Sequence, residues 1–405
     1  MRDALRRVSL LVPAFTLLIL AGCQNGAVAT QHQQSVDNAN GRWREMRSKL
    51  MLQMAERQFE TGDLDQAEKS LGDALAVDAR SPQLYVLAGR VAIERGQLEK
   101  AYQLFTSAIT LHDKLPEAYY YQGLVLQRWQ RFEGALTAYQ LAYQLRPQDA
   151  AYLLAVAETL VNLDRSDEAL TLLTGQLTYF DQNAGVRLAL AQIYMIQKQY
   201  AQAAEFYRQA TLLRPDDTRL LEDLALAQLE AGKYDAAIDN LEQLLAKAEY
   251  ATRTDLMRLL AAGYEASGRM AAAKGIYVKI TQKNPADVEG WLKLASQCWS
   301  LNDPHGTELA AQRALALAPK KYEGYTMLAL VEQQAGHIPQ ALAHLAKAVE
   351  LAPDNAQPWL LQGLMLERNG QRAEAVKAYT QALKCAPDDA RTKKLLARLT
   401  EASAR

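Results

Sequence analysis

One spacing constrains this chain more than any other feature, because the same small and large residues recur every 34 positions. The pattern is clearest between Ala356 and Asp389, where it consists of Trp359, Gly363, Gly370, Ala375, Tyr379, Ala382 and Pro387. Counting back in steps of 34, with two extra residues before Thr254, gives starts at Tyr322, Val288, Thr254, Thr218, Ala184, Ala150, Pro116, Pro82 and Ser48. The spacing therefore predicts ten copies of one supersecondary unit.

Residue size within the unit indicates two helices that cross closely. The eighth position is Ala or Gly in all ten copies, and the twentieth is Ala in every copy except one, which has Thr307. The twenty-fourth position is large in nine copies, with Ala311 as the exception. A large side chain beside small ones lets helices interdigitate. Gly after the first helix and Pro after the second, in six copies each, are typical helix-ending signals.

This pattern resembles the tetratricopeptide repeat (TPR) family, whose unit is a helix–turn–helix of 34 residues. The resemblance covers residues 48–389 and implies an all-α fold, a right-handed α-solenoid superhelix of about ten repeats. Residues 390–405 continue as a Lys/Arg-rich amphipathic segment, which we expect to cap the last repeat. Two segments, 174–183 and 248–254, depart from the pattern. We expect them either to change the superhelical pitch or to divide the array into blocks.

The N-terminus predicts an export signal. Three arginines within the first seven residues precede a 13-residue apolar run, 8–20, which suits a signal peptide and is short for a membrane span. The run ends in Leu-Ala-Gly-Cys, which resembles the lipobox of bacterial lipoproteins. That resemblance implies that residues 1–22 are removed and that Cys23 is lipidated. The alternatives are an ordinary signal peptide cut nearby and a cytosolic protein with a chance apolar start.

The residues after Cys23 suggest where the protein is delivered. Gln24 stands where an Asp would resemble an inner-membrane retention signal, so the sequence favours the outer membrane, with the domain facing the periplasm. Residues 23–47 comprise the lipidated cysteine and a polar, Gln/Asn-rich stretch that we predict to be a flexible tether. Acyl chains contribute roughly 0.8 kcal/mol per buried CH₂, so the anchor would hold firmly.

Composition argues against several function classes. The 45 Lys and Arg residues and 46 Asp and Glu residues give a net charge of −1, which provides no general attraction for nucleic acid. The five histidines have no metal-binding spacing, and no phosphate-binding loop or nucleophile motif occurs. Cys298 and Cys385 are two repeats apart, too far for a disulfide. We therefore predict no enzyme activity, no metal and no cofactor.

In the TPR family the concave wall is formed mainly by the second, fifth, ninth and twelfth residues of each repeat. The Lys and Asn pair of the carboxylate-binding variant does not occur at the fifth and ninth positions. Apolar anchors with scattered polar groups occur at or beside the wall positions instead, and the groove residues we predict are Tyr120, Leu124, Arg128, Leu154, Glu158, Leu188, Gln192, Leu292, Trp299, Leu330, Leu360 and Leu364. Such a groove suits an extended peptide or a helix. The alternative is that many of these residues contact neighbouring repeats.

The sequence thus predicts a lipid-anchored periplasmic scaffold that holds protein partners of a cell-envelope machine. Its layout resembles TPR lipoproteins of pilus assembly and of exopolysaccharide export. The alternative function is an adaptor or regulator of peptidoglycan-remodelling enzymes. Nothing in the sequence chooses between partners within these two classes.

Overall fold

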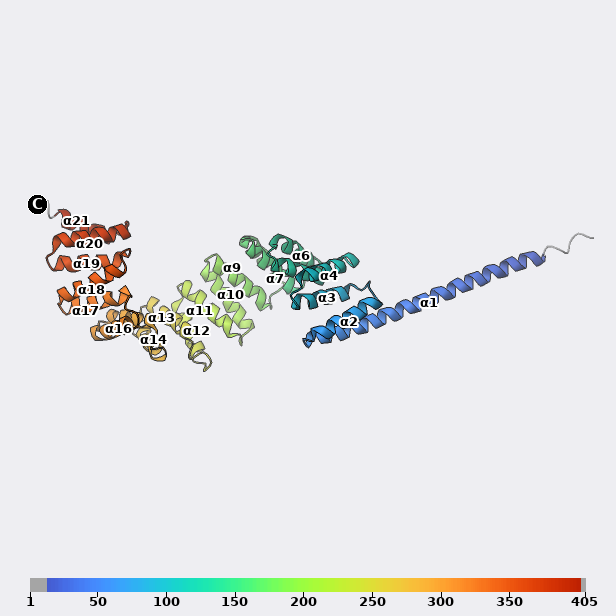
Figure 1. Cartoon of the computed structure of the whole chain (residues 1–405), viewed down its shortest axis with the longest axis horizontal. Coiled ribbons are helices and arrows are strands. Elements are labelled where there is room, and N and C mark those ends of the chain that lie inside the picture. Colours follow the sequence, from blue (N-terminus) through green and yellow to red (C-terminus); the bar gives the residue numbers. More distant parts are fainter. Residues whose placement is uncertain (1–12, 402–405) are drawn as a thin grey trace, which may run out of the picture. The chain divides into compact units, whose positions relative to one another are not determined.

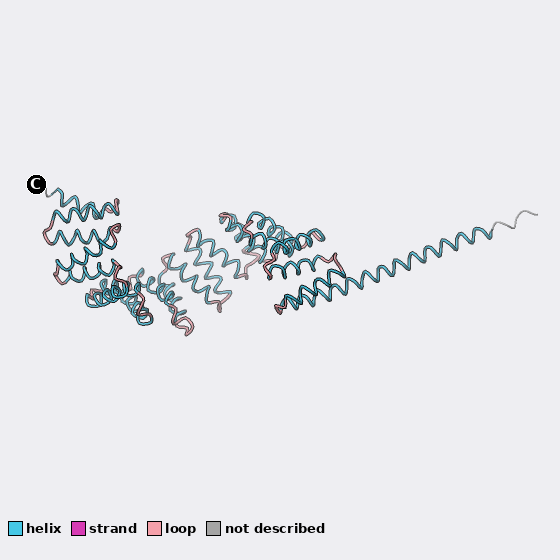
Figure 2. The backbone as a smooth tube through the Cα atoms, viewed as in Figure 1, coloured by secondary structure: helices cyan, strands magenta, loops and turns pink. Residues whose placement is uncertain are grey.

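The computed structural model of this protein describes residues 13–401, and within them all regular structure is α-helical (Figures 1 and 2). The first helices of the repeats are α1 (Pro13–Glu60), α3 (Pro82–Glu94), α5 (Pro116–Arg128), α7 (Ala150–Asn162), α9 (Ala184–Ile196), α11 (Thr218–Glu230), α13 (Thr254–Ala266), α15 (Val288–Ser300), α17 (Tyr322–Gln334) and α19 (Ala356–Arg368). The all-α, helix–turn–helix fold class that the sequence predicted is confirmed.

The second helices alternate with the first ones. They are α2 (Leu64–Val77), α4 (Leu98–Leu111), α6 (Phe132–Leu145), α8 (Ser166–Gln176), α10 (Tyr200–Leu213), α12 (Tyr234–Leu245), α14 (Met270–Lys283), α16 (Pro304–Leu317), α18 (Ile338–Leu351) and α20 (Arg372–Cys385). A further helix, α21 (Ala390–Glu401), packs on α20. From α3 to α19, every first helix begins at the residue where the 34-residue spacing places a repeat start.

The turn inside each repeat has one backbone conformation, whichever residue occupies it. Six copies place Gly there with a positive φ: Gly62, Gly96, Gly232, Gly268, Gly336 and Gly370. The other four use residues with a side chain at φ of 57–59°: Gln130, Asp164, Lys198 and Asn302. The left-handed residue lets the chain close the first helix, as where the amide of Gln97 donates to the carbonyl of Ala92 at 2.8 Å. Packing of the two helices therefore imposes this turn even where Gly is missing.

The core of each repeat depends on the small eighth position. A Cβ added at Gly89 would lie 2.5 Å from the ring of Phe105, and one at Gly123 would lie 2.8 Å from the ring of Tyr139. Both rings belong to the twenty-fourth position and are almost completely buried. Where the eighth residue is Ala, as at Ala55, it is also fully buried. The two helices therefore cross at a distance that only Gly or Ala permits.

The chain forms two compact units, residues 1–189 and 190–405, with the boundary inside α9. Within each unit the helices pair in antiparallel hairpins that stack on one another (Figure 2). Both irregular segments include turns, since α8 ends at Gln176 and α12 ends at Leu245. The first irregular segment, 174–183, precedes the boundary by a few residues, whereas the second lies inside the second unit.

The structure differs from the sequence prediction at residues 23–47, which are helical and not a flexible coil. They belong to the 48-residue helix α1, which extends well beyond its partner α2 (Figure 1). No proline occurs between Pro13 and Pro82, and contacts four residues apart support the helix, such as the Glu45–Lys49 ion pair at 2.8 Å. Ser48 is consequently not a helix start. The role of the segment as a spacer stays a prediction.

Candidate partner-binding surface

All twelve predicted groove residues lie on first helices, and each is exposed or half-buried. In the first unit they are Tyr120, Leu124 and Arg128 on α5, Leu154 and Glu158 on α7, and Leu188 on α9. In the second unit they are Gln192 on α9, Leu292 and Trp299 on α15, Leu330 on α17, and Leu360 and Leu364 on α19. Their accessibility meets the first requirement of a binding surface, while contact with a partner stays a prediction.

Tyr120 is the centre of an aromatic cluster in the first unit. Its ring centroid lies 5.2 Å from that of Tyr121, 5.5 Å from that of Tyr139 and 5.1 Å from that of Tyr152. Burial raises the pKa of the Tyr120 hydroxyl, and it raises the pKa of Tyr152 to about 12. The phenols stay neutral at pH 7 and can donate hydrogen bonds. Tyr120 is therefore a rigid, half-buried anchor fixed from three sides.

A chain of hydrogen bonds runs from this core to the surface. The buried Tyr139 hydroxyl donates to Oε1 of Gln127 at 2.7 Å, and Nε2 of Gln127 donates to Glu158 at 3.0 Å. The chain links α6, α5 and α7 and holds the exposed Glu158 carboxylate beside the cluster. Gln127 was absent from our sequence-based set although it occupies the twelfth position of its repeat. The sequence feature that could have identified Gln127 is the tyrosine twelve residues later. The last repeat has a tyrosine at the same spacing, and there the Tyr379 hydroxyl donates to Glu367, also a twelfth position, at 2.9 Å.

The accessible residues of the second unit belong partly to its core. Leu360 and Leu364 both pack against the cluster that contains Tyr379 and Leu399, and Leu364 also packs against the cluster of Ala329. The alternative interpretation, contact with neighbouring helices, thus describes these two leucines in part. Their half-exposed sides remain available to a partner.

The second unit also has charged residues, on its first helices or immediately before them, that form ion pairs within the protein. Arg253 bridges Glu222 at 3.0 Å and Asp255 at 2.6 Å, and this pairing lowers the pKa of Asp255. Arg258 forms ion pairs with Asp287 and with Glu289. Each arginine therefore links one repeat to the next. Because these charges already have partners, they suit the array's own stability better than recognition of a charged ligand.

Other chemistry was sought in the described residues. They contain no group of three or more His, Cys, Asp or Glu side chains placed to hold a metal ion. Cys298 is buried, which raises the pKa of its thiol, and the half-buried Cys385 thiol lies 3.4 Å from the carbonyl oxygen of Pro353. In the same part of the chain, no helix combines the length and apolar character of a membrane span. The side chain of Cys23 and residues 1–12 lie outside the described part.

Comparison with known protein families finds repeat models along most of the chain. Residues 17–220, half of the chain, match the model described as the cilia and flagella-associated protein 70 C-terminal domain. Residues 221–248 and 326–390 each match a tetratricopeptide repeat model. A "TPR repeat-containing protein" of Treponema pallidum (strain Nichols) is 24% identical over 288 residues, which is 67% of this chain. The match spans only 35% of that relative's length.

Several solved structures are similar at low identity. Pseudomonas aeruginosa pilF is 18% identical with a TM-score of 0.45, covering 50% of this chain and 92% of that one. Yeast Tom70 is 14% identical with a TM-score of 0.43, covering 89% of each chain. Naa15/Naa10 bound to HypK-THB is 16% identical with a TM-score of 0.41, covering 87% of this chain and 66% of that one.

Proposed function

This chain belongs to the tetratricopeptide repeat family, and we propose that it is a membrane-anchored periplasmic scaffold that binds protein partners of a cell-envelope machine. Proteins of this family are in general non-catalytic interaction scaffolds, whose stacked repeats create extended binding surfaces. The observation that carries the proposal is the row of accessible aromatic and aliphatic side chains on consecutive first helices, centred on Tyr120 in the first unit. Rigid aromatic anchors of this kind dominate binding energy at protein interfaces.

The anchor is supported by the sequence alone. An apolar run of signal-peptide length ends in the Leu20–Cys23 lipobox, and Gln24 favours the outer membrane. Lipidation at Cys23 would confine the repeats to a layer near the membrane. Confinement raises the effective concentration of a partner in the same layer without adding any contact. The helix α1 would then set the distance, since 24 helical residues rise about 36 Å.

A photo-crosslinking residue at Glu158 tests the partner surface. Glu158 is exposed and lies beside the aromatic cluster, so we expect it to crosslink a protein of the cell's own envelope. The matched control is Leu212 on α10, a second helix, which is also exposed. Crosslinks of equal yield at both positions, or none at Glu158, would contradict the proposal. Recovery of a peptidoglycan hydrolase or synthase would favour the alternative function.

Replacing Cys23 by Ser tests the anchor. We expect the variant to fold normally, because the repeats begin well after this residue, and to leave the membrane fraction entirely. Fractionation of cells with immunodetection, together with the circular dichroism melting curve, measures both outcomes. Cys385→Ser is the control and should stay at the membrane. Continued membrane attachment of the Cys23→Ser variant would disprove lipidation.

A further inference from the structure

From the second repeat onward, three positions of the first helix face the preceding repeat. The third position is buried in every repeat from the second to the tenth, as Leu84, Ala118, Tyr152, Val186, Leu220, Leu256, Gly290, Gly324 and Pro358. A Cβ at Gly324 would lie 2.7 Å from Leu315 of α16, and one at Gly263, a tenth position, 3.1 Å from Ile238 of α12. The third and tenth positions therefore lie under the second helix of the repeat before. The seventh position lies on the same side, as at Gln122, whose Nε2 donates to the hydroxyl of Thr106 on α4 at 3.1 Å.

Within the described residues no second helix precedes the first repeat, yet this repeat keeps apolar residues at two of these positions, while its tenth position is Arg57. Leu50, at the third position, is 60% exposed, and Met54, at the seventh, is 50% exposed. The apolar face continues toward the N-terminus through Met46, which is 71% exposed, Trp43 and Val36. At 100° per residue these five side chains fall within about 80° of one another on α1. We call them the α1 stripe.

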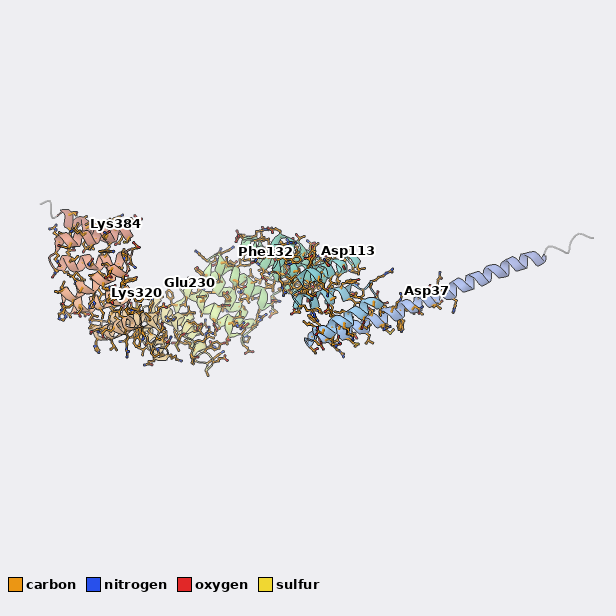
Figure 3. The ribbon with its side chains drawn as sticks, viewed as in Figure 1. Asp37, Asp113, Phe132, Glu230, Lys320 and Lys384 are labelled. Carbon is orange, nitrogen blue, oxygen red and sulfur yellow. The ribbon has the colours of Figure 1, made fainter. Side chains whose placement is uncertain are left out.

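Side chains on this part of α1, near the labelled Asp37, stand clear of the other helices of their unit (Figure 3). The opposite side of α1, represented by Ser48 and Ala55, is buried, and α1 packs against α2 and α3. The α1 stripe is thus an apolar face longer than the 13 residues of an ordinary first helix in this chain. Contiguous exposed apolar faces of this kind mark interaction sites.

At the C-terminal end of the array, by contrast, an additional helix covers the last repeat. There α21 covers the last repeat with Thr392 and Leu399, both buried. Its outer side is basic and exposed, with Arg391, Lys393, Lys394 and Arg398. Terminal units of repeat proteins need such a polar outer face for solubility. Among the described residues only the C-terminal end has such a covering helix, and the apolar α1 stripe is left exposed.

Two properties of the stripe define what fits it. On eight other first helices, α3, α5, α7, α11, α13, α15, α17 and α19, the equivalent face packs against the second helix of the preceding repeat. Exposed arginines lie beside the stripe, with Arg42 on one border and Arg47 and Arg44 on the other. Arg57, also exposed, lies in line with the stripe just beyond Met54. A second copy of α1 lying parallel to the first would bring these arginines against one another, and the basic outer side of α21 would repel them as well. Acidic residues beside the apolar face of a docking helix would complement them.

We propose that the α1 stripe is the docking surface for an amphipathic helix of another protein, whose apolar face is bordered by Asp and Glu. The helix extends the array by packing as the second helix of a preceding repeat would. The surface is separate from the predicted groove, and its failure would leave the groove proposal intact.

The chain itself supplies a probe for this surface. Helix α12 packs on α13, with Ile238 against the tenth position, Gly263, and its charged residues are all acidic. A helix-stabilised, fluorescent peptide of sequence 234–245 should bind the full chain saturably in an anisotropy titration. The double variant Trp43→Ser/Met46→Ser should weaken that binding at least tenfold. Leu212→Ser, at an equally exposed leucine of α10, should leave binding unchanged.

A charge exchange distinguishes specific docking at the α1 stripe from non-specific hydrophobic binding. Replacing Arg47 and Arg57 by Glu should weaken binding of the acidic peptide at least tenfold. A peptide in which Asp235, Asp239 and Glu242 are Lys should show the reverse preference and bind this variant better than the wild type. Restoration of binding by the exchanged pair would establish that the arginines of α1 contact the borders of the helix.

Several outcomes would overturn the proposal. One is peptide binding that Trp43→Ser/Met46→Ser leaves unchanged, and another is no binding at all. In sedimentation velocity, self-association that this double variant abolishes would make a second copy the occupant. In a Cys23→Ser background, binding to vesicles of anionic phospholipid that the double variant abolishes would make the membrane surface the occupant.

Discussion

Replacing Phe105 by Ala is expected to lower the free energy of unfolding of its repeat by about 3–5 kcal/mol. Phe105 is fully buried, and its ring fills the space above Gly89. The substitution removes the transfer free energy of the ring and leaves a cavity between α3 and α4. Chemical denaturation followed by circular dichroism, fitted with a model that lets repeats unfold separately, measures the loss. A loss below about 1 kcal/mol would show that the ring is not packed as described.

A double-mutant cycle tests why the eighth position is Gly in this repeat. Gly89→Ala alone should lower the free energy of unfolding by about 1–3 kcal/mol, because the added Cβ would collide with the Phe105 ring. Phe105→Leu with Gly89→Ala recreates the pair that another repeat uses at Ala55 and Leu71. The double variant should therefore lose less stability than the sum of the two single variants. Strict additivity would mean that the two positions do not compete for the same space.

Replacing Asp287 by Ala is expected to lower the free energy of unfolding by about 2–4 kcal/mol, because this residue has two structural roles. Its carboxylate caps α15 by accepting the Gly290 amide at 3.0 Å. It also accepts a hydrogen bond from Arg258 on the preceding first helix, and its side chain is only 10% exposed. The substitution removes the cap and leaves Arg258 without this partner. Equilibrium urea denaturation measures the loss.

Two variants separate the roles of Asp287. Asp287→Asn keeps an oxygen for the cap and loses the charge, so it should cost less than Asp287→Ala. Asp217→Ala is the matched control, since Asp217 caps α11 through the Arg219 amide at 3.3 Å and forms no ion pair within the described residues. It should lower the free energy of unfolding by about 1 kcal/mol, which is the contribution of a helix cap alone. Equal losses for Asp217→Ala and Asp287→Ala would show that the link between repeats contributes nothing.

Much of the fold could be predicted from the sequence because a repeat is a local unit. The eighth and twentieth positions must be small wherever two helices cross. Gly89 and Ala101 therefore predict a close helix crossing without any information from distant parts of the sequence. The turn was harder, since Gln130 and Lys198 adopt a left-handed conformation that their residue types disfavour. The polarity of residues 23–47 suggested a coil, but helix formation there depends on local spacing and the absence of proline.

For the candidate surface, the sequence predicted accessible positions but not their contacts. The register placed Tyr120 and Leu364 on first helices, and both are half-exposed. That Tyr120 meets Tyr139 and Tyr152, and that Leu364 joins two core clusters, depends on residues of neighbouring helices. The contribution of each residue to a partner's affinity stays a prediction that the crosslinking experiment addresses.

The sequence by itself determined the repeat, its length and the residues that begin each first helix, because these follow from side-chain size and helix-ending residues at a fixed spacing. Only the tertiary structure decided which face each helix shows to water. Leu50 and Leu84 are the same residue at the same position of successive repeats, yet Leu84 is fully buried and Leu50 is mostly exposed. The difference arises because burial depends on the neighbouring repeat, and within the described residues only Leu84 lies on a first helix that packs against the second helix of a preceding repeat.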